Sequence, residues 1–356
     1  MTVCAIVGAQ YGSEGKGVIA NHLANEYDIH TRTGGPNAGH SFVFKGQVFK
    51  MQAIPCGWTN PDALIIIGRG GLLNLDVFQR ELEQIKVHYP DIEDRIVIDS
   101  RAGILDRCFA EEEGHTQGEI HQRIGSTGEG VGAARVARIG RDPGRFRLAR
   151  DVPGISHLLG DTVEYLHYAI GRGEKVLLEG TQGSALSMVH GPWPFVTSAD
   201  TNAGQMLADV GIAPGKLTDV ILVARTFPIR VAGNSGPMRE EITWDRLTRD
   251  LGRPVQERTT VTRKVRRVGR WDPDLIDAAV MLNAPTQIAL TFIDYLSSMD
   301  SGKTRYEDLS FGGRQFVEYV EQTWETPVTL IGTGGFEANG QFNLIDRRGG
   351  NHGIPV

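Results

Sequence analysis

The stretch 8-GAQYGSEGKG-17 follows the apolar run 3-VCAIVG-8 and leads into an amphipathic segment. Glycines after a buried strand, a lysine and a helix start are the usual parts of a phosphate site, because the first amides of a helix have no partner within it. The standard pattern G-x-x-x-x-G-K-[ST] is not matched. Gln10 replaces its first glycine, and Gly17 stands where a hydroxyl would bind magnesium. The parts still predict nucleotide binding, and the alternative is an ordinary glycine-rich turn.

Apolar runs like 3-VCAIVG-8 recur along the chain and end at glycine or polar residues. The others are 64-LIIIG-68, 95-RIVID-99, 175-KVLLEG-180, 219-DVILVA-224, 287-QIALTFID-294 and 328-VTLIGTGG-335. Runs without alternation suit strands that are covered on both faces, as in a parallel sheet. Helical patterns occupy 16–27, 75–88, 160–172, 202–211, 273–283 and 309–324, and Asp272-Pro273 predicts a helix start. The alternation predicts an α/β fold, a mostly parallel twisted sheet flanked by helices, with ligands at the carboxyl ends of its strands.

Length and composition narrow the class of protein. The chain has 356 residues, a net charge of −6 and three cysteines that form no CxxC pair. We expect a single domain over 1–356, with a loop-rich insertion around 101–150 that lies over the active site. The acidic balance argues against a nucleic-acid partner. The apolar runs are all shorter than the roughly 20 residues that span a bilayer, so we expect no membrane partner and a cytoplasmic protein.

Four further clusters are rich in groups that bind anions. They are 34-GGPNAGHSF-42, 124-IGSTGEGVG-132, 179-EGTQGSALSMVHGPWPFVTSADTNAG-204 and 258-RTTVTRKVRRVGRW-271. His40, in the first, is the residue type best suited to acid catalysis near neutral pH, although a lone histidine is more often structural. The last cluster holds five Arg or Lys within residues 263–270. Most charge runs are solvated loops, but in an acidic protein this one suits phosphate or carboxylate substrates.

Taken together and in order, these segments resemble the adenylosuccinate synthetase family. The family patterns Q-[WY]-G-D-E-G-K-G, G-G-x-N-A-G-H, I-G-T-T-G-x-G-I-G, E-G-x-Q-G, H-G-x-x-P-x-V-T-S, T-G-R-x-R-R-x-G-W and L-T-K-x-D correspond here to 10-QYGSEGKG-17, 34-GGPNAGH-40, 124-IGSTGEGVG-132, 179-EGTQG-183, 190-HGPWPFVTS-198, 262-TRKVRRVGRW-271 and 290-LTFID-294. The resemblance implies a homodimeric, magnesium-dependent ligase with a fold like that of P-loop nucleotide-binding proteins. In that family GTP phosphorylates O6 of IMP, and the amine of aspartate then displaces the phosphate.

The resemblance also implies roles for residues at matching positions. The catalytic set is His40, as general acid, with Ser13 and Lys16. The triphosphate site is Gly12, Glu14, Gly15, Lys16, Gly17, Gly39, His40 and Ser41, with the Gly39 carbonyl on magnesium. The monophosphate site is Asn37, Thr127, Gln182 and Thr197. The aspartate site is Thr260, Thr262, Lys264 and Arg266, with Arg263 as an alternative to Lys264. Arg138 is implied to reach the active site of a partner subunit.

Ser13 is the first departure from the family pattern. The family has an aspartate there, which takes the N1 proton of hypoxanthine and helps to bind magnesium. A serine hydroxyl is too weak an acid to act as a base without activation. If the substrate is guanine, a smaller neutral hydroxyl leaves room for its 2-amino group and accepts a hydrogen bond from it. The swap is similar to that of a phage branch, the 2-aminoadenylosuccinate synthetases, which act on dGMP. Such an enzyme would work in the cytoplasm of an infected bacterium.

The second departure lies in the motif that reads the guanine of the donor. The family sequence T-K-x-D is Thr291-Phe292-Ile293-Asp294 here. Asp294 can still accept from guanine, but the missing lysine weakens the expectation of GTP, and Phe292 offers apolar contact to any base. The donor is therefore ATP, dATP or GTP.

Three functions follow from these patterns. The first is a ligase that joins L-aspartate to C6 of dGMP, and the second is an ordinary adenylosuccinate synthetase whose base comes from elsewhere, Glu14 being a neighbour of Ser13. The third is a non-catalytic nucleotide sensor, because a fold does not fix a function. Retention of His40 and Lys16 argues against the sensor.

Overall fold

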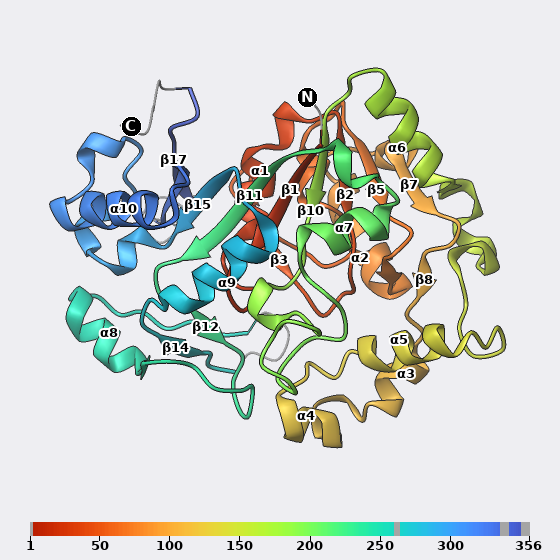
Figure 1. Cartoon of the computed structure of the whole chain (residues 1–356). Coiled ribbons are helices and arrows are strands. Elements are labelled where there is room, and N and C mark those ends of the chain that lie inside the picture. Colours follow the sequence, from red (N-terminus) through yellow and green to blue (C-terminus); the bar gives the residue numbers. More distant parts are fainter. Residues whose placement is uncertain (1–2, 260–263, 335–341, 350–356) are drawn as a thin grey trace.

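A ten-stranded sheet forms the centre of the computed structural model, which describes residues 3–259, 264–334 and 342–349 (Figure 1). The order across the sheet is β17 (Asn343–Asp346), β16 (Val328–Gly334), β15 (Gln287–Thr291), β11 (Leu217–Arg225), β1 (Val3–Gly8), β10 (Val176–Glu179), β2 (Ile29–Arg32), β5 (Leu64–Ile67), β7 (Ile96–Asp99) and β9 (Leu159–Gly160). Neighbouring strands are parallel except β16 and β17. The predicted parallel α/β sheet is confirmed.

Helices cover both faces of the sheet, as the continuous apolar runs require. Helices α6 (Thr162–Gly171), α7 (Ala203–Val210), α9 (Pro273–Asn283) and α10 (Phe311–Trp324) pack on one face, where Val7 of β1 is buried. Helices α1 (Lys16–His22) and α2 (Leu75–Lys86) pack on the other face, where Ile6 is buried. The side chain of Asp272 accepts from the Asp274 amide at 3.2 Å and caps α9, as the sequence predicts.

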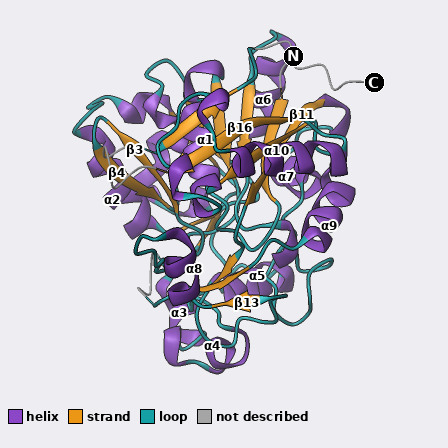
Figure 2. Ribbon diagram, turned by 90° about the vertical axis from the view of Figure 1, so that its left-hand side faces the viewer, coloured by secondary structure: helices purple, strands orange, loops and turns teal. Residues whose placement is uncertain are grey.

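The remaining elements gather on one side of the sheet (Figures 1 and 2). They include α3 (Arg107–Glu112), α4 (Glu119–Ile124), α5 (Val131–Gly140) and α8 (Trp244–Leu251). A small sheet of β12 (Ile229–Arg230), β14 (Arg267–Gly269) and β13 (Glu241–Ile242) anchors the basic cluster. Strands β6 (Leu72–Leu73) and β8 (Gly103–Ile104) pair beside α3 and α5. Strands β3 (His40–Phe44) and β4 (Gln47–Met51) pair apart from this group, on the face of the sheet covered by α1 and α2. Among the described residues, none of the helices is long and apolar enough to cross a membrane.

The structure departs from the predicted elements in three places. Helix α1 ends at His22 and not near residue 27. The stretch 101–150 carries three helices, α3 to α5, where the sequence predicts mainly loop. Strand β2 has no apolar run, yet all four residues of 29-IHTR-32 are buried. His30 and Arg32 find hydrogen-bond partners inside the protein, and Arg32 belongs to the site described next.

Candidate functional site

The loop between β1 and α1 is braced by Glu14. One oxygen of its buried carboxylate, Oε1, accepts from the amides of Gln10 and Gly12 at 2.9 and 2.8 Å. The other, Oε2, lies 2.6 Å from the ammonium of Lys16, whose side chain is also buried. Because these partners occupy both oxygens, Glu14 is a structural group of the loop and is not placed to act as a base.

Glycines allow the loop to approach its neighbours closely. A Cβ on Gly17 would lie 2.7 Å from the Cβ of His40, so any larger residue would push His40 away from the first turn of α1. A Cβ on Gly8 would lie 2.6 Å from Glu14 Oε2 and 2.7 Å from Lys16 Nζ. The departure from the standard phosphate-loop pattern at position 17 therefore has a steric reason. A serine or threonine there would displace the histidine.

His40 is the centre of a buried cluster at the ends of β2, β3 and β10. The register of β2 and β10 places Arg32 beside Glu179. His40 Nδ1 lies 2.5 Å from Glu179 Oε1, and Arg32 Nη1 donates to the same oxygen at 2.8 Å. Glu179 Oε2 accepts from the Cys56 amide at 2.6 Å. Since an ionised carboxylate only accepts, the hydrogen of neutral His40 lies on Nδ1.

Charges in this cluster set the protonation states. Burial, and then the charge of Arg32, lowers the pKa of His40 to about 4. Burial acts to raise the pKa of Glu179, but the His40 hydrogen bond, the Arg32 charge and the Cys56 amide together lower it. At neutral pH the pair is therefore a neutral imidazole and a carboxylate. Nε2 of His40 is buried and has no hydrogen-bond partner in the described part of the chain.

The same cluster brings three metal-ligating atoms together, from His40, Cys56 and Glu179. The carboxylate already accepts hydrogen bonds from His40, Arg32 and the Cys56 amide. A cation placed among them would also face the buried Arg32 guanidinium. The arrangement orients a histidine and is unsuited to a metal ion.

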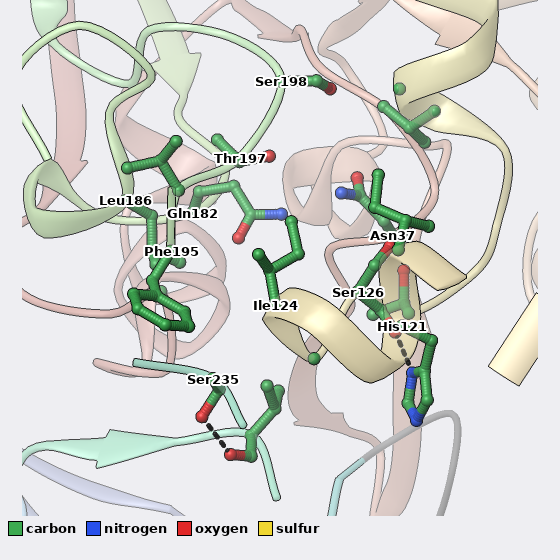
Figure 3. Close-up of a pocket in the computed structure, with 18 of the residues that line it drawn as sticks. Asn37, His121, Ile124, Ser126, Gln182, Leu186, Phe195, Thr197, Ser198 and Ser235 are labelled. Carbon is green, nitrogen blue, oxygen red and sulfur yellow. Dashed lines mark hydrogen bonds between the residues drawn. The ribbon is translucent and has the colours of Figure 1, made fainter. Parts of the chain in front are cut away.

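A cavity of about 910 Å³ opens in front of the loop between β1 and α1, residues 9–15, which is called the phosphate loop below. The cavity collects most of the residues predicted to bind the nucleoside monophosphate and aspartate. Its lining includes Ser13, Asn37, Gly39, Thr127, Gln182, Thr197, Lys264 and Arg266. Figure 3 shows Gln182, Leu186, Phe195 and Thr197 on one side of this space, with Asn37, Ser126 and His121 on the other. Part of the wall comes from α3 to α5, the stretch 101–150. The cavity is large enough for a nucleotide.

Ser13 is held at the wall of this cavity by two arginines. Its Oγ accepts from Arg266 Nη1 at 2.7 Å, and its carbonyl accepts from Arg225 Nη1 at 2.9 Å. A hydroxyl oxygen has two lone pairs, so one stays available for a ligand. Arg266 thus joins the phosphate loop to the basic cluster in which the aspartate site is predicted.

The donor motif lies on the other side of the phosphate loop. Thr291 Oγ1 donates to the Glu14 carbonyl at 2.6 Å. Phe292 has a φ of 59°, and the Arg225 guanidinium lies 3.8 Å from the centre of its ring. Asp294 is buried, and Arg253 Nη2 donates to its Oδ2 at 2.6 Å. The residue in the place of the family's lysine is therefore an aromatic ring that covers a buried arginine.

Some predicted site residues lie apart from the cavity. Arg138 is on α5, where its Nη2 lies 3.4 Å from the Arg69 carbonyl and its guanidinium packs on Phe146. Ser41 is in β3 and pairs with Lys50. Thr260, Thr262 and Arg263 lie outside the described residues.

Sequence reasoning missed four charged residues of the site, namely Arg32, Arg225, Arg253 and Glu257. Glu257 pairs with Arg225 at 2.5 Å and accepts from the Tyr295 hydroxyl at 3.1 Å. Arg32 and Arg225 are the last residues of two buried strands. A charged residue at the carboxyl end of such a strand could have indicated a site residue, because ligands bind at those ends.

Known proteins share this arrangement along most of the chain. The sequence matches the model described as adenylosuccinate synthetase over residues 5–152 and 147–303. It is 39% identical to the adenylosuccinate synthetase of Methanococcus maripaludis over 337 residues, which cover 94% of this chain and 96% of that one. The adenylosuccinate synthetase of Archaeoglobus fulgidus is 38% identical over the same shares.

Two solved structures have the same fold. Fully ligated adenylosuccinate synthetase of Plasmodium falciparum superimposes with a TM-score of 0.83 at 21% identity, covering 98% of this chain and 100% of that one. The succinoaminodeoxyadenylate synthetase of cyanophage S-2L, bound to dGMP and to dATP as an energy donor, superimposes with a TM-score of 0.77 at 27% identity. That match covers 94% of this chain and 93% of the phage protein.

Proposed function

The chain belongs to the adenylosuccinate synthetase family, a family of carbon–nitrogen ligases, and we propose that it joins L-aspartate to C6 of dGMP at the expense of a nucleoside triphosphate. The observation that carries this proposal is Ser13, in the place of the family's aspartate, held by Arg266 at the wall of the cavity. The phage relative with dGMP bound supports the choice of substrate. The archaeal relatives, named as ordinary synthetases, support IMP.

The hydrogen bond from Arg266 explains how Ser13 favours guanine. Arg266 takes one lone pair of the hydroxyl at 2.7 Å, and the 2-amino group of guanine donates to the other. Hypoxanthine has a hydrogen atom in place of that amino group and leaves the lone pair without a partner. An aspartate at position 13 would be larger, would pair with Arg266 and would fill the space of the amino group.

The reaction proceeds in two balanced steps. Guanine loses its N1 proton, O6 attacks the γ-phosphorus, and the bond to the bridging oxygen breaks to release a nucleoside diphosphate. The α-amine of aspartate then attacks C6, the C6–O6 bond breaks, phosphate leaves, and the nitrogen loses a proton. The first step develops negative charge next to His40. The N1 proton of guanine, relayed through water to Nε2, gives the imidazolium that donates to this charge as general acid, and Glu179 stabilises the imidazolium through Nδ1–H.

The remaining roles follow the resemblance. Gly12, Glu14, Gly15, Lys16, Gly17, Gly39, His40 and Ser41 form the triphosphate site. Asn37, Thr127, Gln182 and Thr197 hold the monophosphate, and Lys264 and Arg266 hold aspartate carboxylates. Glu14 is held by two loop amides and by Lys16, so we propose that the N1 proton leaves through water in the cavity and not directly to Glu14.

Magnesium fits the site if substrate phosphates supply most of its ligands. Mg²⁺ prefers oxygen ligands and commonly keeps several waters and substrate phosphates. Ser13 removes one carboxylate from the family's set, which leaves the Gly39 carbonyl as the protein ligand implied by the resemblance. The ion would neutralise phosphate charge during transfer.

We also propose a homodimer in which Arg138 of each subunit reaches the partner's active site. Val136 and Ile139, its neighbours on α5, are 64% and 72% exposed, and large apolar side chains this exposed are typical of an interface.

A substrate matrix tests the function. IMP, GMP and dGMP are each combined with ATP, dATP or GTP in the presence of aspartate and Mg²⁺, and products are identified by mass. We expect the succinyl adduct of dGMP to form fastest. Equal or faster formation from IMP would refute the guanine assignment and support an ordinary synthetase. Absence of aspartate-dependent phosphate release with every pair would support a sensor.

The Ser13→Asp variant separates the two enzymatic alternatives. If guanine is the substrate, the carboxylate occupies the space of the 2-amino group, and use of dGMP falls. If hypoxanthine is the substrate, the carboxylate restores a base, and turnover of IMP rises. Arg266 would be the partner of the serine hydroxyl in the wild type and of the aspartate carboxylate in the variant. The comparison therefore changes only the group at position 13.

A further inference from the structure

His121, on the short helix α4, lines the cavity and has no role in the function proposed above. Both of its ring nitrogens have partners. Nδ1 contacts the carbonyl oxygen of Ser126, as Figure 3 shows, and Nε2 lies 3.3 Å from the ammonium of Lys264. Because a carbonyl oxygen only accepts, the hydrogen of the neutral ring is on Nδ1, and Nε2 accepts from the ammonium.

The ammonium of Lys264 is held in place without being neutralised. Thr259 fixes the backbone, because its amide donates to the Lys264 carbonyl at 2.9 Å and its Oγ1 accepts from the Lys264 amide at 3.0 Å. The side chain lines the cavity, and in the described part of the chain its partner is His121, while no carboxylate forms an ion pair with it. The positive charge is therefore left for a ligand.

Arg266, the other described residue proposed to bind the carboxylates of aspartate, is held in the same way. Its guanidinium donates to the Ser13 hydroxyl at 2.7 Å and to the Arg258 carbonyl at 3.4 Å, and both acceptors are uncharged. An uncharged acceptor fixes the direction of a cation and leaves its charge to attract an anion, whereas a carboxylate in that place would compete with the substrate.

Resting on the ligase function proposed above, we propose that His121 is a positioning residue for L-aspartate. Its Nε2 directs the ammonium of Lys264 toward a carboxylate of the substrate and adds no negative charge to the site. The neutral ring suits this task because it offers an acceptor on one nitrogen while the other nitrogen is fixed by Ser126.

The contact with Ser126 gives His121 a structural role as well. Ser126 precedes Thr127, which is proposed to hold the monophosphate, and both line the cavity. Helix α4 has no buried residue, so polar contacts hold it in place, and one of these is the bond from Asn234 Nδ2 to the Arg123 carbonyl at 2.8 Å. A purely structural role of His121 would affect the nucleotide as much as aspartate.

Three variants at position 121 separate the two roles. His121→Gln keeps an uncharged amide donor and acceptor, His121→Leu removes both, and His121→Glu places a carboxylate beside Lys264. We expect the KM for aspartate to rise about threefold or less in H121Q, about three- to tenfold in H121L and more than about tenfold in H121E. The KM of each nucleotide and kcat should change less than about twofold, because the effect is on one carboxylate contact.

Two other variants complete the experiment. His167→Leu is the matched control, because His167 Nε2 on α6 lies 2.9 Å from the Gly211 carbonyl and does not line the cavity. It should leave every KM unchanged. Lys264→Met should raise the KM for aspartate and remove the difference between H121L and H121E, since both act through Lys264.

Three results would overturn the proposal: an equal KM for aspartate in H121L and H121E, a nucleotide KM that rises as much as that of aspartate, or an unchanged KM for aspartate in K264M. Thermal denaturation establishes that each variant is folded, which the lack of buried residues in α4 favours. Each KM is measured with dGMP and with IMP. Absence of aspartate-dependent phosphate release from the wild type with both would refute the ligase function itself, whereas a wrong order among the variants refutes only the role of His121.

Discussion

Glu179 and Asp294 are buried carboxylates at the carboxyl edge of one sheet, and they differ in how their charge is satisfied. Glu179 is surrounded by His40, Arg32 and the Cys56 amide, at distances from 2.5 to 2.8 Å. Asp294 has Arg253 on one oxygen, while the other has no partner in the described part of the chain. Ser13, which lines the cavity, resembles Asp294, since a single donor, Arg266, holds its hydroxyl.

The contrast separates the groups proposed for phosphoryl transfer from those proposed to select the substrate. The groups proposed to stabilise the transferring phosphoryl group, His40 and Glu179, already have their hydrogen bonds to each other without a ligand, which is the preorganisation that electrostatic catalysis requires. The groups proposed to face a substrate base keep a hydrogen-bond acceptor open for a ligand. Substitutions in the first region should therefore lower turnover with every substrate, and substitutions in the second should change which substrate is used.

The largest effect is expected from Glu179→Gln. The amide keeps the shape of the side chain but removes the charge that stabilises an imidazolium at His40, so kcat should fall by about 10²–10³-fold with every donor and acceptor. Steady-state kinetics with saturating substrates measures this loss. KM values should change much less, because Glu179 does not line the cavity in which the nucleotide is proposed to bind.

Glu81→Gln is the matched control for that loss. Glu81 is 1% exposed, and its carboxylate accepts from the amides of Ala53 and Ile54 at 3.1 and 2.9 Å. Both substitutions remove a buried negative charge, so both should lower the melting temperature. If E81Q lowers kcat as strongly as E179Q, the effect of Glu179 is on folding and not on His40.

A smaller effect is expected in the pH dependence of stability, at Asp294. Burial raises the pKa of Asp294 to about 6, against the opposing charge of Arg253, from a usual value near 3.8. Between these values the folded state binds more protons than the unfolded state, so this group's contribution is present below pH 3.8 and is lost as pH rises through 6. The loss amounts to about 2–3 kcal/mol.

Chemical denaturation isolates this contribution. The unfolding free energies of the wild type and of Asp294→Asn are compared from about pH 4 to about pH 7.5, the range in which the protein should stay folded. The wild type should lose unfolding free energy relative to D294N as the pH rises through 6, because only the aspartate loses its proton. Arg253→Met removes the opposing charge and should move the transition to higher pH. A difference that stays constant over the whole range would show that Arg253 satisfies Asp294 as fully as its partners satisfy Glu179.

The sequence predicts the apolar part of the molecule well and the charged part poorly. The strands around β1 follow from continuous apolar runs, because burial on both faces leaves a local signal. Strand β2 leaves none, since the polar residues of 29-IHTR-32 are buried between β10 and β5, where Arg32 meets Glu179, 147 residues away. Ser13 and Phe292 stand out as departures from a motif, but their contacts with Arg266 and Arg225 are long-range and appear only in the fold.

The smallest effect, and the most specific, is expected from Ser13→Ala. The methyl group removes the acceptor for the 2-amino group of guanine and leaves that group without a partner in the cavity. Because the hydrogen bond involves a neutral donor and a neutral acceptor, kcat/KM for dGMP should fall by only about tenfold. IMP lacks the amino group, so its kcat/KM should stay the same or rise slightly.

IMP is the internal control of that experiment, and the aspartate KM supplies a second. Arg266 loses its bond to Oγ in the variant, which frees it for the carboxylates of aspartate, so the aspartate KM should fall or stay constant. An equal loss for dGMP and IMP would mean that Ser13 supports the loop as Glu14 does and reads no base. A loss confined to dGMP would place Ser13 among the groups that choose the substrate and leave the phosphoryl transfer itself unchanged.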